Sequence, residues 1–529
     1  MGETLYNGIE LPNEWPPRNL GPAGYDPMPV PYLETSPPVI PIDVGRQLFV
    51  DDFLIAETSM QRVFHAAEKF ENNPVMKPET SLERETSGVF PAAVPKDGGV
   101  WWDPAERRFK MWYEAGWCGA LSYAVSADGL VWSRPELDVN PPTNQVVQGL
   151  VGDSGAVVLD LDSENPRQRY KMFQRECNAA IGMGRGPGNS LVSADGIHWS
   201  APVKTGPVGD RSTMFYNAFR KKWVYSIRSS RAGIGRAREY REHDDFLQGA
   251  TWTDTEKVFW CGADRHDTPD PEIGDPAQLY NLTAVAYESI MLGLFEIHLG
   301  PSNEKCKEQR RPKITELKTA FSRDGFHWHR PDRNVFIEAV RNPDAWDRGY
   351  VQSVGGICTI HDDELWFYYT GFAGDSGNAT DRFGFPAALY SNGCTGIAKL
   401  RRDGFASMHA NEEETVLLTR PVTFSGSHLF VNVDNPNGEL GVELCDKNGT
   451  VLSGFSKVDC LPVGTDSTRV RIQWDDRSSV AEFAGRPVRF RFYLRDGDLY
   501  GFWVSGSARG ESSGYIAAGG PGFTSNRDL

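Results

Sequence analysis

The sequence predicts an all-β protein, a five-bladed β-propeller followed by a C-terminal β-sandwich. One turn phrase recurs along the first 408 residues, and the pattern of the chain changes after Met408. The 529 residues include 54 Gly and 35 Pro, which suits many short strands joined by turns. A repeat of this kind is typical of folds in which similar sheets are arranged around an axis.

The recurring phrase predicts one β-hairpin in each blade. Clear copies end at Trp132, Trp199 and Trp328, and degenerate copies end at Trp252 and Met408. Ser and Asp hydrogen-bond turn amides and Gly accepts a positive φ, so each phrase joins a strand to a tight turn. We expect the acids of the clear copies to be structural: Asp128, Asp195 and Asp324.

A second pair of strands precedes most copies of the phrase. Alternating patterns rich in aromatic and β-branched residues occupy residues 98–116, 156–176, 214–228 and 356–372. Two strands before the phrase and two around it give a four-stranded sheet, and five such sheets form a propeller over residues 75–408. The predicted blades are residues 75–145, 146–206, 207–260, 261–338 and 339–408.

The two ends of the chain differ from this repeat. The N-terminal segment, residues 1–74, contains a strand at Arg46–Thr58 that we expect to complete the last blade and close the ring. Short strands separated by turns predict a β-sandwich over residues 409–510. Residues 511–529 are rich in Gly and Ser and predict a flexible tail.

The composition argues against several partners. A net charge of −16 disfavours nucleic acid, and no stretch of 18 apolar residues predicts a membrane span. Residues 1–12 lack the order of a signal peptide, so we expect a cytoplasmic protein, or a secreted one whose signal was removed. The scattered cysteines lack zinc spacing and predict free thiols: Cys118, Cys177, Cys261, Cys306, Cys358, Cys394, Cys445 and Cys460. The 15 Trp residues suit either sugar stacking or packing between sheets.

The repeated phrases, the leading LFVDDFLIAET and the terminal sandwich resemble the five-bladed propeller glycoside hydrolases of families 32, 43 and 68. The resemblance implies a carbohydrate substrate and cleavage of a glycosidic bond, and it favours furanosides such as fructosides or arabinosides. Family 32 enzymes carry Asn-Asp-Pro-Asn, Arg-Asp-Pro and Glu-Cys boxes, and none of these is in place here. The Glu176–Cys177 pair stands at the end of a second strand instead. The chain is therefore similar to a divergent member.

Glycoside hydrolysis needs two carboxyl groups that flank the bond. The resemblance implies that they stand where the inner strand of each blade begins. The acids at those positions are Glu83, Glu85, Asp153, Asp210 and Asp347. By analogy, Glu83 or Glu85 would be the base or nucleophile, Asp153 would orient the sugar, and Asp210 would be the acid, alone or with Asp347. Each of these acids could equally cap a turn.

Further residues near the predicted channel suit sugar binding. Arginines could bind hydroxyls or an anionic group, and aromatic rings together with Tyr350 could form a stacking wall. His65 either points into the site or packs elsewhere, and Asp51 and Asp52 also suit a strand edge. The predicted binding residues are Asp52, His65, Arg211, Arg228, Tyr280, Asn281, Trp346 and Arg348.

We expect no required cofactor or metal. A structural Ca²⁺ occurs in the channel of some members of the resembling families, but the chain has no EF-hand pattern. Two alternatives remain open from the sequence. One is a glycoside phosphorylase or transglycosylase on the same fold, and the other is a non-catalytic carbohydrate-binding protein.

Overall fold

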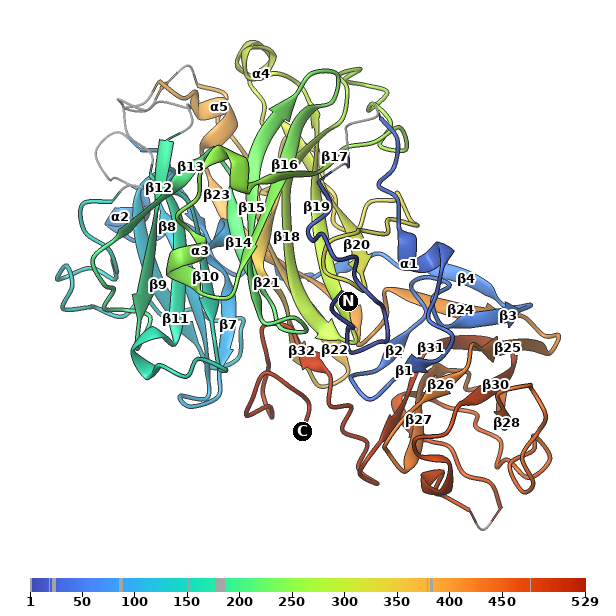
Figure 1. Cartoon of the computed structure of the whole chain (residues 1–529). Coiled ribbons are helices and arrows are strands. Elements are labelled where there is room, and N and C mark those ends of the chain that lie inside the picture. Colours follow the sequence, from blue (N-terminus) through green and yellow to red (C-terminus); the bar gives the residue numbers. More distant parts are fainter. Residues whose placement is uncertain are drawn as a thin grey trace.

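The chain is mostly β in a computed structural model, with 44% of residues in strands and 7% in helices, which confirms the predicted all-β class (Figure 1). The structure describes residues 2–18, 20, 25–84, 89–150, 152–176, 186–377, 379–380, 384–475 and 477–529. The helices in these ranges are short, and none of them has the length and apolar character of a membrane span. They are α1 (Pro31–Glu34), α2 (Ser81–Arg84), α3 (Phe246–Gly249), α4 (Asn303–Gln309) and α5 (Ala387–Tyr390).

The described residues between 68 and 401 form five antiparallel sheets, which we number in chain order. Sheet 1 contains β6 (Ala93–Val94), β7 (Val100–Asp103), β8 (Arg108–Ala115) and β9 (Ala120–Ser126). Sheet 2 contains β10 (Gly152–Leu159), β11 (Tyr170–Glu176), β12 (Gly186–Ser193) and β13 (Val203–Val208). Sheet 3 contains β14 (Thr213–Asn217), β15 (Lys222–Arg231), β16 (Gly235–His243) and β17 (Val258–Gly262).

Sheets 4 and 5 each take a strand from a distant part of the chain. Sheet 4 contains β18 (Gln278–Glu288), β19 (Ile290–Gly300) and β20 (Ile314–Ser322), with β32 (Tyr515–Ile516) added beside β18. Sheet 5 contains β21 (Gly349–His361), β22 (Glu364–Phe372) and β23 (Gly393–Arg401), with β5 (Glu68–Lys69) added beside β23. Both chain ends are therefore built into these sheets.

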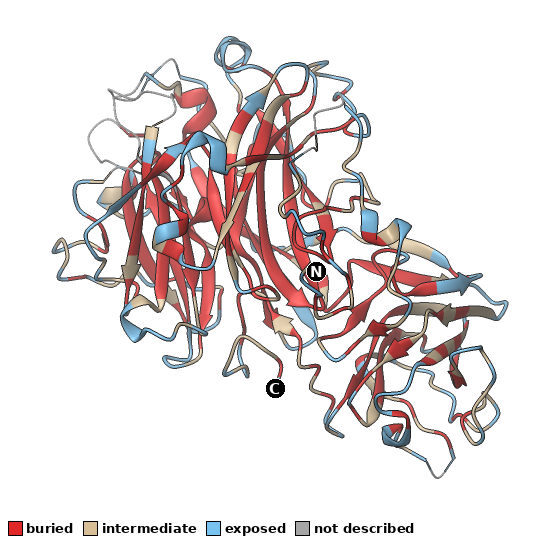
Figure 2. Cartoon of the chain, viewed as in Figure 1, coloured by how far each residue is buried: buried red, intermediate tan, exposed pale blue. Residues whose placement is uncertain are grey.

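The first strands of the five sheets contact one another in a closed circuit. The turn η1 (Lys96–Gly98) and β7 lie beside β10, β10 lies beside β14, β14 beside β18, β18 beside β21, and β21 returns to β7. The circuit places the beginnings of these strands around one axis. Figure 2 shows that these strands are largely buried.

The recurring phrase forms the turns that the sequence predicts. In the first copy, the Ser126 hydroxyl accepts a hydrogen bond from the amide of Gly129 at 2.8 Å. The Asp128 carboxylate accepts from the amides of Leu130 and Val131 at 2.8 and 2.9 Å. The same bonds recur in the copies that contain Asp195 and Asp324. The structural role expected for these three aspartates is confirmed.

Two six-stranded sheets follow, drawn largely in orange and red in Figure 1. In the described part of the chain, sheet 6 contains β1 (Ile40–Pro41), β3 (Ile55–Thr58), β25 (Thr415–Thr419), β26 (Val422–Thr423), β28 (Glu439–Asp446) and β30 (Val488–Arg495). Sheet 7 contains β2 (Gln47–Leu48), β4 (Gln61–Phe64), β24 (Ala406–Ala410), β27 (His428–Asp434), β29 (Asp466–Arg471) and β31 (Gly497–Ser505). One apolar core is shared by residues of both sheets.

The N-terminal strand that closes the ring differs from the predicted one. The strands within Arg46–Thr58 join sheets 6 and 7, and the short strand β5 completes sheet 5 instead. The physical reason is burial, because Phe49, Phe53 and Leu54 lie in the core between sheets 6 and 7. The Phe49 ring stacks on Phe502, with ring centroids 5.7 Å apart.

Residues 511–529 are packed against the ring, in contrast to the flexible tail that their composition predicts. The amide of Ala517 donates to the carbonyl of Ala286 in β18, and that of Ala518 donates to Cys358 in β21. Trp102 in β7 donates its amide to the carbonyl of Ala518. The small residues permit this contact, since a Cβ on Gly520 would lie 1.9 Å from the Ile360 carbonyl oxygen. The tail therefore crosses the ends of three first strands.

Asp51 and Asp52 lie between β2 and β3 and differ in burial, so replacing each of them tests this fold. Asp51 is buried and ion-paired with Arg323 at 2.8 Å, whereas the Asp52 side chain is 73% exposed beside Arg62. Breaking a buried pair typically costs about 3–5 kcal/mol, and an exposed pair about 0–1 kcal/mol. Asp51→Asn should lower the free energy of unfolding by about 3–5 kcal/mol in urea titrations, with Asp52→Asn as the matched control. Equal losses in the two variants would contradict the assignment.

Candidate functional site

A buried ionic cluster lies where the first strands begin. Arg211 precedes β14 and adopts a left-handed φ of 58°. Its guanidinium lies 2.9 Å from the Asp97 carboxylate and 2.8 Å from the Glu296 carboxylate. Asp97 is in η1 of sheet 1 and Glu296 is in β19 of sheet 4. One arginine of the third repeat thus holds two carboxyl groups from different sheets.

Two further side chains complete this inner cluster. Asn281 in β18 donates its amide to the other oxygen of Asp97 at 2.9 Å. Arg238 in β16 donates to the carbonyl of Arg211 at 2.7 Å and to the carbonyl of Tyr280.

Several polar atoms of the cluster are buried without a hydrogen-bond partner among the described residues. They include Oδ1 of Asn281, Oε1 of Glu296 and Nε of Arg211. Buried polar atoms are normally satisfied, so such atoms mark a place where a polar ligand or water would bind.

The pKa values of both carboxyl groups are raised above their usual values. Burial raises the pKa of Asp97 and of Glu296, and the neighbouring Arg211 offsets this only in part. A carboxyl group that keeps its proton closer to neutral pH can act as a general acid.

The pKa of Asp210, next to this cluster, is shifted in the opposite direction. Burial alone would raise its pKa, but Arg228, followed by Arg175, Arg236 and Lys313, holds the pKa below its usual value. The Nε of Arg228 lies 3.2 Å from the carboxylate. Asp210 is therefore ionised while the inner carboxyls retain protons more readily.

An aromatic wall stands beside these charges. The Lys313 ammonium donates to the hydroxyl of Tyr280 at 2.9 Å and to that of Tyr390 at 3.3 Å. The Tyr280 and Tyr350 hydroxyls are 3.0 Å apart. Trp117 stacks on Tyr390, with ring centroids 4.2 Å apart. The rings of Tyr280 in sheet 4, Tyr350 in sheet 5 and Tyr390 in α5 thus surround the Lys313 ammonium, and Trp117 extends this wall from the turn between β8 and β9.

Part of the sequence-predicted set meets in this region. The members that the structure brings together are Asp210, Arg211, Arg228, Tyr280 and Asn281. Sequence reasoning missed Asp97, Glu296 and Lys313 as site residues. The signal for Asp97 was its position in a Lys-Asp-Gly-Gly turn directly before the first strand of sheet 1.

The Glu83 carboxylate, by contrast, accepts four hydrogen bonds from groups outside the ionic cluster. Its carboxylate accepts from the Tyr113 hydroxyl at 2.7 Å and from Nε of Arg134 at 2.6 Å. It also accepts from the amides of Glu79 and Thr80, which fastens α2 to sheet 1. Its pKa is lowered despite burial, mainly by Arg134. These contacts give Glu83 a structural role.

Two other predicted acids are not described in full. Glu85 lies outside the described residues. Asp153 belongs to β10, but its side chain also lies outside the described set.

The predicted residues around Asp347 fasten the closing strand of sheet 5. Asp347 lies 2.7 Å from the Lys69 ammonium of β5 and accepts from the Tyr369 hydroxyl at 2.9 Å. Trp346 packs on Tyr369, with ring centroids 5.3 Å apart. Arg348 is half-buried, and burial together with a neighbouring arginine lowers its pKa.

Asp52 and His65 lie beside sheet 7. Asp52 pairs with Arg62 at 2.5 Å. A ring nitrogen of His65 is 2.9 Å from the Ser407 hydroxyl, and the ring packs on Tyr500. Both partners of His65 belong to strands of sheet 7, so His65 packs between the strands rather than in the ionic cluster.

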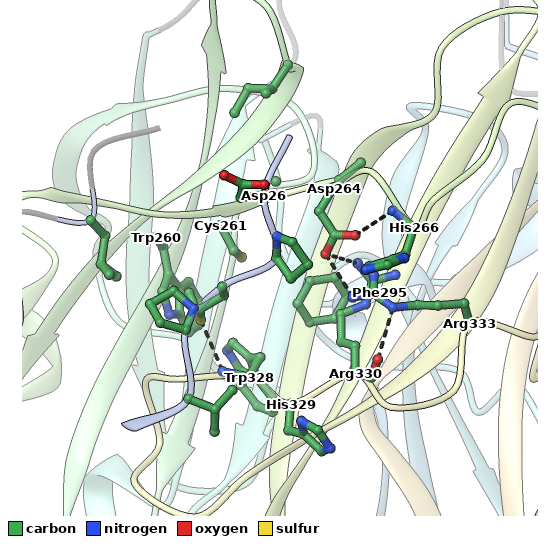
Figure 3. Close-up of a pocket in the computed structure, with 18 of the residues that line it drawn as sticks. Asp26, Trp260, Cys261, Asp264, His266, Phe295, Trp328, His329, Arg330 and Arg333 are labelled. Atoms are coloured by element: carbon green, nitrogen blue, oxygen red, sulfur yellow. Dashed lines mark hydrogen bonds and ion pairs between the residues drawn. The ribbon is translucent and has the colours of Figure 1, made fainter. Parts of the chain in front are cut away.

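A separate cavity of about 530 Å³ lies between β17, β19 and the segment that follows β20 (Figure 3). Residues 26–30 cross it, and its aromatic walls include Trp260, Phe295 and Trp328. Its arginines are already paired, since Arg330 lies 2.6 Å from Asp267 and Arg333 lies 2.9 Å from Asp264. The arginines of this cavity are thus paired with its aspartates within the protein.

The described side chains form no group of three or more His, Cys, Asp or Glu that could hold a metal ion. The described cysteines are buried free thiols, and Cys177 lies outside the described residues.

No protein-family model and no curated protein matches the chain. It is similar to three solved structures that each hold an oligosaccharide. An N-acetylgalactosamine deacetylase from F. plautii with blood group B trisaccharide is 14% identical, with 66% of this chain and 96% of that chain covered and a TM-score of 0.42. An exo-β-1,3-galactanase from Phanerochaete chrysosporium with β-1,3-galactotriose is 9% identical, with 84% and 99% covered and a TM-score of 0.36.

The third structure is an α-L-arabinofuranosidase from Podospora anserina in complex with cellotriose. It is 10% identical, with 63% of this chain and 97% of that chain covered and a TM-score of 0.37. At these identities and TM-scores, function has to be inferred from the chain's own residues.

The raised pKa of Glu296 predicts a pH-dependent stability. The folded protein holds a proton that the unfolded chain releases above its ordinary pKa of 4.5. This contribution is present below that pH and is lost as the pH rises through the folded-state pKa. As the pH rises from 4.5 through the folded-state pKa, the wild type should therefore lose stability relative to Glu296→Gln in urea titrations.

Asp128 supplies a control, because its pKa is shifted in the opposite direction from that of Glu296. Turn amides lower its pKa despite some burial, so its contribution is lost as the pH falls rather than as it rises. Parallel pH profiles for the wild type and Glu296→Gln would contradict the raised pKa of Glu296.

Proposed function

We propose that the chain is a glycoside hydrolase in which sheets 1–5 form a five-bladed β-propeller and sheets 6 and 7 form a β-sandwich beside it. The closed circuit of first strands supports the propeller arrangement. One observation carries the functional proposal. It is the pair of buried carboxyls, Asp97 and Glu296, on either side of Arg211 and next to the ionised Asp210.

The opposite pKa shifts supply the two roles that hydrolysis requires. A carboxyl group whose pKa is raised can protonate the leaving oxygen, and one whose pKa is lowered can accept a proton from water or attack the sugar. Asp97 or Glu296 would therefore be the acid, and Asp210 the base or nucleophile. The proton given to the leaving group is replaced when water completes the cleavage.

The unpartnered atoms and the aromatic wall support a sugar as the ligand. Buried acceptors at Asn281 and Glu296 could take hydrogen bonds from sugar hydroxyls. Tyr280 and Tyr350 each combine an apolar ring face with a hydroxyl at the ring edge. Rings with a polar tip suit a ligand that is apolar on its faces and polar on its edges. Furanosides, favoured by the sequence resemblance, are the first substrates to test.

Amide variants test the assignment of the acids. Asp210→Asn should lower kcat by about 10²–10⁴-fold, and so should the amide variant of the carboxyl that acts as the acid, either Asp97→Asn or Glu296→Gln, because each removes one proton-transfer group. Turnover would be measured on aryl arabinofuranosides, aryl pyranosides and oligosaccharides.

Asp347→Asn is the matched control, because Asp347 is also a buried acid just before a first strand but pairs with Lys69 and Tyr369. It should lower the melting temperature and leave kcat unchanged. Wild-type kcat in all three folded axial variants would reject the proposal.

A further inference from the structure

Positive charge gathers around one ring at the edge of the proposed active site. Arg236, His298 and Lys313 all lie close to Tyr280, and we call them the Tyr280 cluster. The guanidinium carbon of Arg236 lies 5.2 Å from the Tyr280 ring centroid and the ammonium of Lys313 lies 4.8 Å from it. The centroid of the His298 ring lies 5.6 Å away, stacked at 20°.

Lys313 is a buried ammonium without an anion. It is 2% exposed, and its hydrogen bonds go to the hydroxyls of Tyr280 and Tyr390. Within the described ranges, no carboxylate lies at ion-pair distance from it. Phenol oxygens and ring faces compensate a buried charge only in part. The site therefore favours an incoming negative charge.

Arg236 has hydrogen-bonding capacity to spare. It lies at the start of β16, is half-buried, and donates one terminal nitrogen to the Gln278 side chain at 2.9 Å. Its Nε is buried and has no partner in the described part of the chain. A guanidinium presents donors in a fixed plane that matches an oxyanion.

His298 supplies the third group. It is 6% exposed, and its Nδ1 has no partner among the described residues. Burial, with Lys313 and Arg236 nearby, holds the pKa of His298 well below its usual value. The ring is therefore neutral and can donate one N–H without adding a further charge to the cluster.

The negative net charge of the chain makes this cationic cluster selective for anions that fit it. The chain carries a net charge of −16, yet the Asp210 carboxylate, whose pKa is lowered in part by Arg236 and Lys313, pairs with Arg228 at 3.2 Å. An acidic protein repels anions in general, so a local cationic pocket would select those that fit it.

We propose that the Tyr280 cluster binds an oxyanion during the reaction. The oxyanion is either the carboxylate of a uronic-acid glycoside or inorganic phosphate that serves as the attacking group. This inference rests on the proposed function, because it places the oxyanion beside the carboxyls that act on the glycosidic bond. If phosphate attacks, its oxygen bonds to the anomeric carbon as the bond from that carbon to the leaving oxygen breaks. The leaving oxygen takes the proton of the acid, Asp97 or Glu296, and the acid regains a proton from solvent after the products leave.

Binding measurements test the cluster independently of turnover. Calorimetric titration of the wild type with glucuronate, galacturonate and inorganic phosphate would be compared with titration with glucose and galactose. At least one oxyanion should bind at least about 10-fold more tightly than the neutral sugars, since a charge-assisted hydrogen bond contributes this much or more.

Arg236→Gln should weaken oxyanion binding by about 10- to 100-fold and leave neutral sugars unaffected. Arg231→Gln is the matched control, because this arginine lies on the same hairpin but pairs with Glu239 at 3.4 Å. It should bind oxyanions as the wild type does. Uronate binding identifies a sugar-borne carboxylate, and phosphate binding with phosphate-dependent turnover identifies phosphorolysis.

The proposal is overturned if no oxyanion binds more tightly than the neutral sugars, or if Arg236→Gln binds oxyanions as the wild type does. Cleavage of neutral glycosides together with either result would leave the proposed function standing and remove the oxyanion site. Oxyanion binding that depends on Arg236, without turnover of any glycoside, would leave the oxyanion site standing and remove the proposed function.

Discussion

The guanidinium of Arg211 is the contact on which the centre of the ring depends. It comes from the third repeat and holds a carboxyl group from sheet 1 and another from sheet 4. Without it, Asp97 and Glu296 would be two buried acids that lack the cation 2.9 and 2.8 Å from them, and sheets 1, 3 and 4 would lose their common ionic partner. The left-handed backbone at Arg211 costs conformational energy, and the axial ion pairs offset that cost.

Local chemistry explains why much of the fold could be predicted from the sequence. The turn at Asp128 is built from neighbours within three residues, so its phrase predicts the same hairpin wherever it recurs. The closing strand could not be found in this way. The apolar run around Phe49 fits the core of either part of the molecule, and only its long-range packing against Phe502 decides which sheets it joins.

The candidate site likewise contains residues that the sequence predicts from local position and residues that only long-range packing brings together. Arg211 and Asn281 were predicted because they stand where a first strand begins, and that position alone brings them to the axis. The sequence does not point to Asp97, because Glu83 and Glu85 stand where the inner strand of the first blade is expected to begin, and the Glu83 carboxylate instead anchors α2. Glu296 belongs to a second strand, and its place near the axis depends on the pairing of β19 with β18, in which Glu296 lies opposite Asn281; the pattern within one strand does not encode that register.

The strands that complete the sheets come from opposite ends of the chain. Sheet 5 needs β5 from residues 68–69, sheet 4 gains β32 from residues 515–516, and sheets 6 and 7 combine residues 40–64 with residues after 405. During synthesis, the N-terminal strands emerge long before their partners exist. Their apolar side chains, such as Phe49 and Leu54, must remain uncovered until almost the whole chain has left the ribosome. Completion of sheets 4 to 7 therefore waits for distant parts of the chain, whereas the described strands of sheets 1 to 3 are consecutive in the sequence.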